Sequence, residues 1–362
     1  MTQRPENTEP SHPEFTPGSI SETIGKQDLA YVMSQFSIGK IQNIVKSKRG
    51  SRRSPKLRIT TTDGQFLLKR RAIGRDDLEQ VAISHSIQEH LLREQFPVPG
   101  LVLADDGNTA VHREGRIYEL FHYVSGLRFD YSNSQALEAG RVLGLFHNLL
   151  REYSPHPAMK SNSYHVGRRV SKLLDEINLL LHSIEKERAL VGIGESLQYL
   201  DSQYKEAYST VNKQKLDSLP IYIVHGDWHP GNLLYDNGRV VAVLDFDSVR
   251  LTPRVIDLAN AVLQFSIQMG RPDKIEQWGE GFRLDSIESV LRGYNEVVHE
   301  SLSDAEIATI PHLMVEALVV ESLIPINSFG TFGEIPGSMF LKMVEKKIKW
   351  FKPQINCILK ML

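Results

Sequence analysis

Residues 221–249 read IYIVHGDWHPGNLLYDNGRVVAVLDFDSV and combine two histidines, four aspartates and two asparagines with apolar runs. The dipeptide Asn237-Gly238 is a strong two-residue turn signal, and the apolar segments on either side of it predict a hairpin of buried strands. Most of the Asp and Asn residues of this stretch therefore lie at the ends of the predicted strands. Such a concentration of polar groups beside apolar runs needs a chemical explanation.

Three of these polar residues have the order and spacing of a phosphate-transfer site. Asp227 and Asn232 fit the pattern H-x-D-x-x-x-x-N that starts at His225, and Asp245 follows the hairpin in Asp-Phe-Asp, where kinases have Asp-Phe-Gly. In a kinase, the first Asp accepts the proton of the acceptor hydroxyl, the Asn holds magnesium, and the later Asp bridges metal ions to the triphosphate. The alternative interpretation is that Asp227 and Asn232 only cap a turn and a helix start.

A site of this kind also needs a lysine that binds phosphate and a glutamate that fixes the lysine. Lys69 ends the predicted strand QFLLK, and strand alternation places it on the same face as Leu67, with Arg70 on the opposite face. Glu89 lies on the predicted inward face of the next helix, where pairing with Lys69 would remove the cost of burying its carboxylate. The alternative is that Glu89 faces solvent.

The order of the predicted elements divides the chain into two lobes. Residues 1–25 lack periodicity and hold several prolines, which predicts a disordered tail. Residues 26–123 predict a small antiparallel lobe with a hairpin about Asp63-Gly64, and residues 124–362 predict a larger helical lobe. Helices are predicted at 134–150, 170–183, 196–213, 255–269, 287–300, 304–323 and 340–358. The predicted fold class is therefore α+β.

The helix that carries Glu89 is predicted to begin at an Asp76 cap and to end before the segment FPVPG, because proline cannot continue a helix. Its expected inward positions are Leu78, Val81, Ala82, His85 and Leu92.

Composition excludes several classes of protein. The 362 residues are 41% apolar and 24% charged, with a formal net charge of −2, which argues against general binding to nucleic acid or to a membrane surface. The single cysteine, Cys357, excludes an intramolecular disulfide and a cysteine-based zinc site. No apolar run of spanning length and no signal peptide are recognised, so a cytoplasmic location is expected.

The chain resembles the aminoglycoside phosphotransferase family, which has a protein-kinase-like fold and also includes choline, homoserine and methylthioribose kinases. The residues that carry the resemblance are VHGDWHPGNLL, VLDFDSV and the later RVIDLA. FLLKRR, QEHLLREQFPVP and RVLGLFHNLL match as well, so the resemblance covers about residues 30–265.

The resemblance implies a two-lobed kinase that uses ATP and Mg²⁺ to phosphorylate a hydroxyl of a small molecule, such as an amino alcohol, an amino acid, a sugar or an aminoglycoside-like compound. It implies that Asp227 is the catalytic base and that Asn232 and Asp245 hold magnesium. It also implies that Lys69 binds phosphate and is anchored by Glu89.

The resemblance further implies an interlobe hinge at residues 119–123, whose backbone meets the adenine, so that Glu119, Phe121 and Tyr123 are expected to bind the cofactor. Asp257 is expected to be structural and to hydrogen-bond the backbone near the catalytic loop. The acceptor pocket is expected in the helical lobe, with Trp228, Trp278 and Glu280 as candidate contacts.

One loop departs from the family pattern. The predicted phosphate-covering segment KSKRGSRRSPK, residues 46–56, contains one glycine and six basic residues. Arg49, Arg52 and Arg53 are candidates to touch ATP, whereas the usual meaning of such a run is a solvated, mobile loop.

Two other functions remain open at this point. A metal-dependent hydrolase could use His225, Asp227, His229 and Asp245 as a metal-binding cluster, although this leaves Asn232 without a role. A pseudokinase that only binds nucleotide is the other alternative, but every catalytic position is filled.

Overall fold

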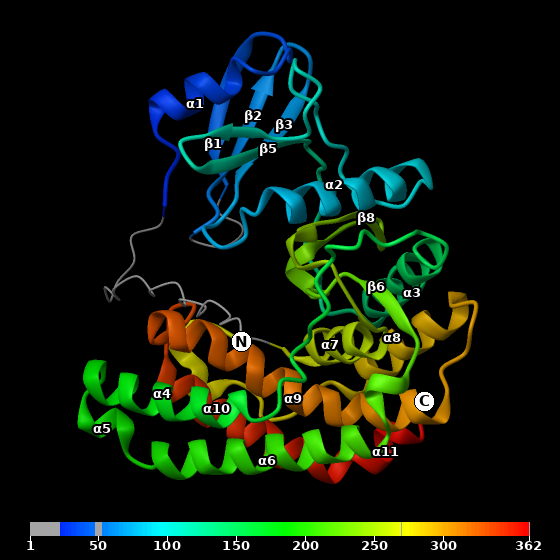
Figure 1. Ribbon diagram of the computed structural model, residues 1–362. Helices are drawn as coiled ribbons and strands as arrows, with labels where there is room; N and C mark the ends of the chain where they lie inside the picture. Colours follow the sequence, from blue (N-terminus) through cyan, green and yellow to red (C-terminus); the bar gives the residue numbers. More distant parts are fainter. Residues whose placement is uncertain (1–21, 48–52, 269, 362) are drawn as a thin grey trace, which may run out of the picture.

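The computed structural model describes residues 22–47, 53–268 and 270–361, which form two lobes (Figure 1). The predicted α+β, two-lobed architecture is confirmed. Most of the predicted tail, residues 1–21, lies outside the described residues, as do Arg49, Arg52 and Met269. The last four residues of the predicted tail are described, and Glu22 among them pairs with Arg70 and Arg116.

The N-terminal lobe is built on a five-stranded antiparallel sheet with the order β1-β2-β3-β5-β4. Its strands are β1 (Ile41–Lys46), β2 (Lys56–Thr61), β3 (Gln65–Arg70), β4 (Val111–Arg113) and β5 (Arg116–His122). The hairpin predicted about Asp63-Gly64 joins β2 to β3 and is confirmed. One face of the sheet packs against α1 (Lys26–Met33) through a core that contains Ile59, Leu68 and Leu120. Because strand side chains alternate, Lys69 and Glu119 lie on the other face.

Helix α2 (Leu78–Arg93) packs below the sheet, between it and the helical lobe (Figure 1). Its N-cap is Asp77, one residue after the predicted Asp76, and the Asp77 carboxylate accepts a hydrogen bond from the Gln80 backbone N–H at 2.9 Å. The predicted inward face is partly wrong: Val81 and His85 are buried as expected, but Leu78, Ala82 and Leu92 are exposed. The buried residues are Val81, Ile83, Ser84, His85, Ile87, Gln88 and Leu91.

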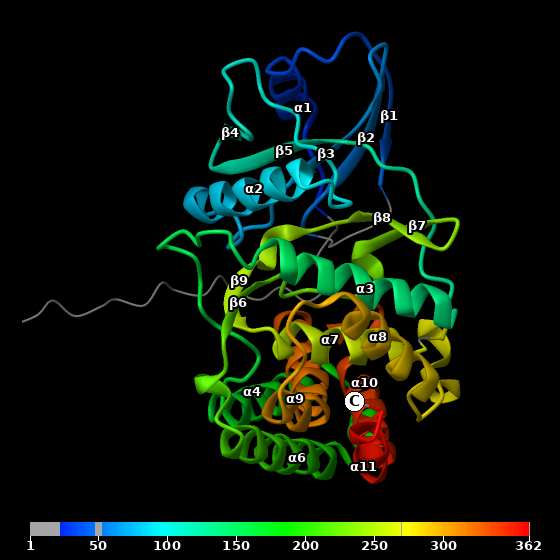
Figure 2. The same ribbon diagram turned by 90° about the vertical axis from the view of Figure 1, so that its right-hand side faces the viewer.

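The C-terminal lobe consists mainly of helices that enclose one large core. Its helices are α3 (Asn133–Leu149), α4 (Arg169–Ile184), α5 (Glu187–Leu190), α6 (Ile193–Lys213), α7 (Val255–Ser266), α8 (Leu284–Val297), α9 (Asp304–Phe329), α10 (Gly337–Phe351) and α11 (Ile355–Leu359). Six of the seven predicted helices are present with shifted ends, and the predicted helix 340–358 is divided into α10 and α11 by a 3-10 turn over Lys352–Gln354. α3 and α8 lie side by side in both views (Figures 1 and 2). They pack so closely that a Cβ at Gly140 would meet the Val290 carbonyl oxygen at 2.0 Å.

Helix α9 corrects one expectation about the composition of the chain. By length and hydropathy, this 26-residue helix would be able to cross a membrane, whereas no run of spanning length was expected. However, 72% of its apolar window is buried inside the protein. A helix that is apolar on all sides is typical of the centre of a large helical core, which is where α9 lies.

Two short antiparallel strand pairs lie on the helical lobe where it faces the sheet (Figure 2). β6 (Ile221–Val224) pairs with β9 (Arg250–Pro253), and β7 (Leu233–Asp236) pairs with β8 (Arg239–Val243). The second pair is the hairpin predicted about Asn237-Gly238. The segments between these strands are the two loops that contain the predicted catalytic and metal-binding residues.

Candidate active site

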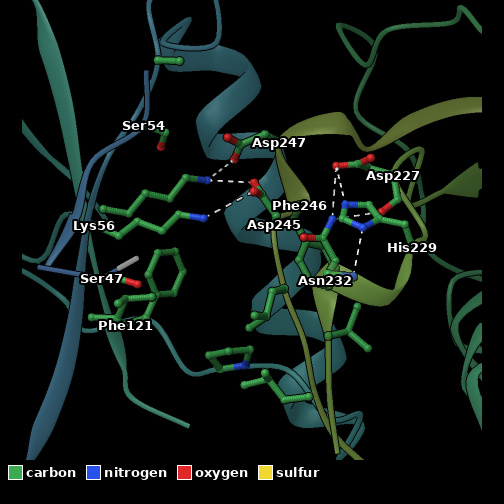
Figure 3. Close-up of a pocket in the computed structure, with 18 of the residues that line it drawn as sticks. Ser47, Ser54, Lys56, Phe121, Asp227, His229, Asn232, Asp245, Phe246 and Asp247 are labelled. Atoms are coloured by element: carbon green, nitrogen blue, oxygen red, sulfur yellow. Dashed lines mark hydrogen bonds and ion pairs between the residues drawn. The ribbon is translucent and has the colours of Figure 1, made fainter. Parts of the chain in front are cut away.

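A cavity of about 1010 Å³ lies between the two lobes. Seven of the eight predicted site residues line it, and Glu89 is the exception: Lys69, Glu119, Phe121, Tyr123, Asp227, Asn232 and Asp245. Figure 3 shows two opposite walls of this cavity, with Lys56 and Phe121 on strands of the sheet and Asp227, Asn232 and Asp245 on the loops of the helical lobe. The structure thus brings together residues that are up to 176 positions apart in sequence.

The predicted catalytic loop between β6 and β7 is held in shape by hydrogen bonds that involve its own Asn232 side chain and Asp257 on α7. Asn232 Nδ2 donates to the Asp227 backbone oxygen at 3.0 Å and to Asp227 Oδ2 at 3.1 Å. The buried Asp257 carboxylate accepts the backbone N–H groups of His225 and Gly226 at 2.7 and 2.8 Å. This is the structural contact expected for Asp257. The loop therefore presents the Asp227 carboxylate to the cavity from a fixed backbone.

Two aromatic side chains of this loop, His225 and Trp228, point into the core. His225 is fully buried, and its Nε2 donates to the Leu244 carbonyl oxygen at 3.1 Å. Trp228 is also fully buried, with its ring 5.4 Å from that of His225. The expectation that Trp228 contacts an acceptor is therefore wrong. Trp278 does not line the cavity either, because it packs against the core of the helical lobe.

His229 is the histidine of this loop that faces the cavity. Its Nδ1 accepts the Gly231 backbone N–H at 3.0 Å, and its Nε2 lies 3.7 Å from Asp227 Oδ2. Burial alone would raise the pKa of Asp227, but the contact with His229 holds it below the ordinary value. Asp227 is therefore ionised at neutral pH, as a proton acceptor must be.

Asp245 follows β8 with a backbone φ of +66°, a left-handed conformation that Asp tolerates better than most residues. Its carboxylate lies 3.1 Å from Lys69 Nζ and 3.5 Å from Lys56 Nζ. Burial would raise the pKa of Asp245, but these two ammonium groups hold it well below the usual range. Two residues on, Asp247 lies 2.6 Å from Lys69 Nζ.

Lys69 and Leu67 both line the cavity, whereas Arg70 points away toward Glu22, as strand alternation predicts. Burial would lower the pKa of Lys69, but Asp245, Glu119 and Asp247 together raise it above its usual value. Lys69 is therefore a permanently charged ammonium group on the wall that faces the catalytic loop.

Glu89 is not the partner of Lys69. Its side chain is exposed on α2, and the carboxylates within 4 Å of Lys69 Nζ are Glu119, Asp245 and Asp247. The error comes from the helix phase: polar residues such as Ser84 occupy part of the inward face, and an apolar stripe cannot reveal them.

Glu119 is not part of a hinge, because it lies within β5, fully buried and directly opposite Lys69 in the β3–β5 register. The chain leaves the sheet only after His122, where β5 ends. Phe121 and Tyr123 lie at this exit and line the cavity, as expected for residues near the base of a nucleotide.

The basic loop also contributes to this region. Arg53 and Lys56 line the cavity, and the Arg53 guanidinium lies 4.3 Å from the centre of the Phe329 ring on α9. Arg53 therefore contacts the helical lobe beside the cavity.

Glu321 on α9 is a half-buried acid close enough to Asp227 for their charges to interact, and the sequence analysis did not identify it. Gln264 Nε2 donates to its carboxylate at 2.5 Å. Burial and, secondly, the negative charge of Asp227 raise the pKa of Glu321 to about 7. Glu321 is a single acid in an apolar helix and is far from Asp227 in sequence, so no local pattern predicts that the two residues interact.

Replacing Glu321 by Gln is expected to change how stability depends on pH. Between the usual 4.5 and about 7, the folded protein keeps a proton that the unfolded chain has lost, so this group makes the wild type less stable as pH rises. We expect Glu321→Gln to gain stability over the wild type from pH 5 to pH 8, by at most roughly 3 kcal/mol. Urea unfolding at both pH values measures this, with the exposed Glu334→Gln as control. Parallel pH profiles for wild type and Glu321→Gln would contradict it.

Comparison with known proteins places this geometry in a family. The sequence matches the phosphotransferase enzyme family over residues 48–294, more than half of the chain. Stress response kinase A of Escherichia coli (strain K12) is 27% identical over 244 residues, which cover 67% of this chain and 64% of that protein. Serine/threonine protein kinase RdoA of Salmonella typhimurium (strain LT2) is 26% identical over 258 residues, covering 70% and 69%. The match thus spans less than two thirds of the length of Stress response kinase A.

Solved structures share the fold at low identity. An aminoglycoside phosphotransferase from Alicyclobacillus acidocaldarius has a TM-score of 0.68 at 14% identity, covering 95% of this chain and 99% of that one. A microcompartment-associated aminopropanol kinase has a TM-score of 0.65 at 13% identity, covering 93% and 99%. Amicoumacin kinase hAmiN, in complex with AMP-PNP and Ca²⁺, has a TM-score of 0.62 at 15% identity, covering 92% and 94%. With the family match over most of its length, the chain belongs to the phosphotransferase enzyme family.

Proposed function

We propose that this protein transfers the γ-phosphate of ATP, with Mg²⁺, to a hydroxyl group of a small molecule. The observation that supports this most strongly is the convergence of Asp227, Asn232, Asp245 and Lys69 on one interlobe cavity. A volume of about 1010 Å³ is at the upper end of the range for ligand pockets, which suits a nucleotide and a small acceptor bound together.

The side chains at the cavity fit a magnesium ion. Because Asn232 Nδ2 donates to Asp227, its Oδ1 is left as an acceptor, and the Asp245 carboxylate adds oxygen atoms of the kind that Mg²⁺ prefers. Asn232 and Asp245 would hold the ion, which when bound neutralises charge on the phosphates. Asp227, ionised at neutral pH, would orient the acceptor hydroxyl and take its proton.

The nucleotide side of the cavity has the matching chemistry. Lys69 and Lys56 place two ammonium groups beside Asp245, where a triphosphate would lie. Leu67, Phe121 and Tyr123 supply apolar and aromatic surface for a base. The AMP-PNP bound to amicoumacin kinase hAmiN, which shares this fold, also supports ATP as the donor.

On the acceptor side, we favour a substrate that carries an amine as well as a hydroxyl. The ionised Asp227 carboxylate at the cavity would attract an ammonium group. An amino alcohol has both groups, and an aminopropanol kinase is among the proteins with this fold.

A serine hydroxyl of a protein is the second candidate acceptor. The observation that favours it is the relative described as serine/threonine protein kinase RdoA. The catalytic arrangement would be the same, because both acceptors present an alcohol to Asp227.

The other two functions have less support. A metal-dependent hydrolase would need His225 as a ligand, but its Nε2 is used by the Leu244 carbonyl oxygen. Within residues 22–47, 53–268 and 270–361, no group of three or more His, Cys, Asp or Glu side chains is arranged to hold a metal. A pseudokinase would not need an ionised carboxylate at position 227.

The test is a screen of ATP consumption with Mg²⁺ over panels of amino alcohols, amino acids and sugars, and over serine-containing proteins as a separate arm. The Asp227→Asn variant serves as the blank. We expect an amino alcohol to stimulate ATP consumption by the wild type only, with one phosphorylated product per ATP. If no acceptor in either arm raised the wild type above the blank, the proposal would be wrong.

A further inference from the structure

We propose that Glu119 on strand β5 is the residue that positions Lys69 for phosphate binding, in place of a glutamate on helix α2. This inference rests on the proposed function, since it assigns a role within ATP binding. It concerns a positioning residue, because Glu119 acts through Lys69 and is itself fully buried.

The two oxygen atoms of Glu119 have different surroundings. Oε1 accepts a hydrogen bond from Arg71 Nε at 2.8 Å and lies 2.6 Å from His85 Nε2. Oε2 is buried without a hydrogen bond from any residue that the structure describes, and the Lys69 ammonium group lies 3.7 Å from it. Arg71 and His85 therefore fix the carboxylate and leave one oxygen directed at Lys69.

The strand register makes this arrangement rigid. Lys69 and Glu119 are directly opposite each other on β3 and β5, so their side chains leave the sheet on the same face. A sheet pair holds the two side chains together whatever the position of α2. The charges of Lys69 and Arg71, with the hydrogen bond to His85, keep the pKa of Glu119 well below the usual range despite its burial.

Helix α2 offers no carboxylate for this task. Its two acidic residues, Glu79 and Glu89, are both exposed. The inward side chains of α2 that reach the cluster are neutral or basic: His85 contacts Glu119, and the Ser84 hydroxyl accepts a hydrogen bond from Arg71 Nη2 at 3.0 Å. A small hydroxyl on the helix and an acid on the strand together give the same local charge as the reverse arrangement.

Arg71 extends the cluster toward the catalytic side. Its Nη2 lies 2.7 Å from Glu119 Oε1 and 3.1 Å from Asp247 Oδ1. Asp247 in turn lies 2.6 Å from Lys69 Nζ. Lys69 is therefore held between Glu119 on its own sheet and Asp247 on the helical lobe. Without Glu119, the remaining carboxylates would draw the ammonium group away from the sheet.

The test uses the full chain and compares Glu119→Gln with Glu89→Gln, a matched substitution on the exposed face of α2. We expect Glu119→Gln to raise the Kd for MgATP and to lower kcat/KM for MgATP by roughly tenfold to a hundredfold, as for other displaced catalytic groups. Glu89→Gln should match the wild type. The rise in Tm caused by MgATP should shrink in Glu119→Gln, which a purely structural role would not produce. Glu119→Asp provides the same comparison if Glu119→Gln does not fold.

Two further variants separate a role through Lys69 from a general effect. In a Lys69→Met background, Glu119→Gln should add little further loss, because the group on which it acts is gone. Adding Ser84→Glu to Glu119→Gln should recover MgATP binding by restoring an acid beside Arg71.

The outcomes are distinct. Wild-type MgATP binding in Glu119→Gln, or full additivity with Lys69→Met, would overturn this inference and leave the proposed function intact. Absence of MgATP binding by the wild-type protein itself would overturn both.

Discussion

Replacing Asp227 by Asn is expected to abolish phosphate transfer while leaving MgATP binding close to that of the wild type. The amide cannot accept the proton of an acceptor hydroxyl, and loss of a general base typically costs roughly 10²- to 10⁴-fold in rate. Asn is the informative substitution because its Oδ1 still accepts the hydrogen bond that Asn232 Nδ2 donates at 3.1 Å. The loop can therefore keep its shape.

The measurement is kcat for the acceptor found in the screen, together with Kd for MgATP by calorimetry. Asp236→Asn is the control, since Asp236 is exposed near the β7–β8 turn and does not line the cavity. Near-normal kcat in Asp227→Asn would refute the assignment of the base. A parallel loss of MgATP binding would show instead that the substitution had disturbed the metal site through Asn232.

The sequence predicted those parts of the fold that depend on local signals. The Asn237-Gly238 and Asp63-Gly64 turns each join two adjacent strands, and both hairpins are present. Asp227 and Asn232 lie in the same loop, so the hydrogen bond between their side chains depends only on a short stretch of backbone. The helices of the C-terminal lobe were predicted because apolar periodicity over a dozen or more residues is a strong signal.

The partners of Lys69 could not be predicted in the same way. The pair of Lys69 and Glu119 depends on which strands are neighbours and on their register, and neither is encoded near either residue. The inward face of α2 was predicted only in part, because Ser84 and Gln88 are buried with hydrogen bonds and an apolar stripe does not include them. Glu321 likewise acquires its surroundings only when α9 packs beneath the catalytic loop.

Replacing Asp245 by Asn is expected to have the second large effect, on the metal requirement. Asn tolerates the left-handed backbone at this position, where φ is +66°, whereas Ala would add strain to the loss of the carboxylate. The substitution removes one negative charge from a hard-cation site, so the Mg²⁺ concentration for half-maximal activity should rise by about tenfold to a hundredfold. It also leaves Lys56 and Lys69 without a shared counter-charge.

Titration of activity with Mg²⁺ at fixed ATP measures this effect, and Asp247→Asn separates the two aspartates. Asp247 is paired with Lys69 and Arg71, so its loss should weaken ATP binding with a smaller change in the Mg²⁺ midpoint. An Asp245→Asn variant with the wild-type Mg²⁺ midpoint would contradict the role of Asp245. If Asp247→Asn showed the larger shift in the Mg²⁺ midpoint, the metal would be held by the second aspartate of the Asp-Phe-Asp sequence instead of the first.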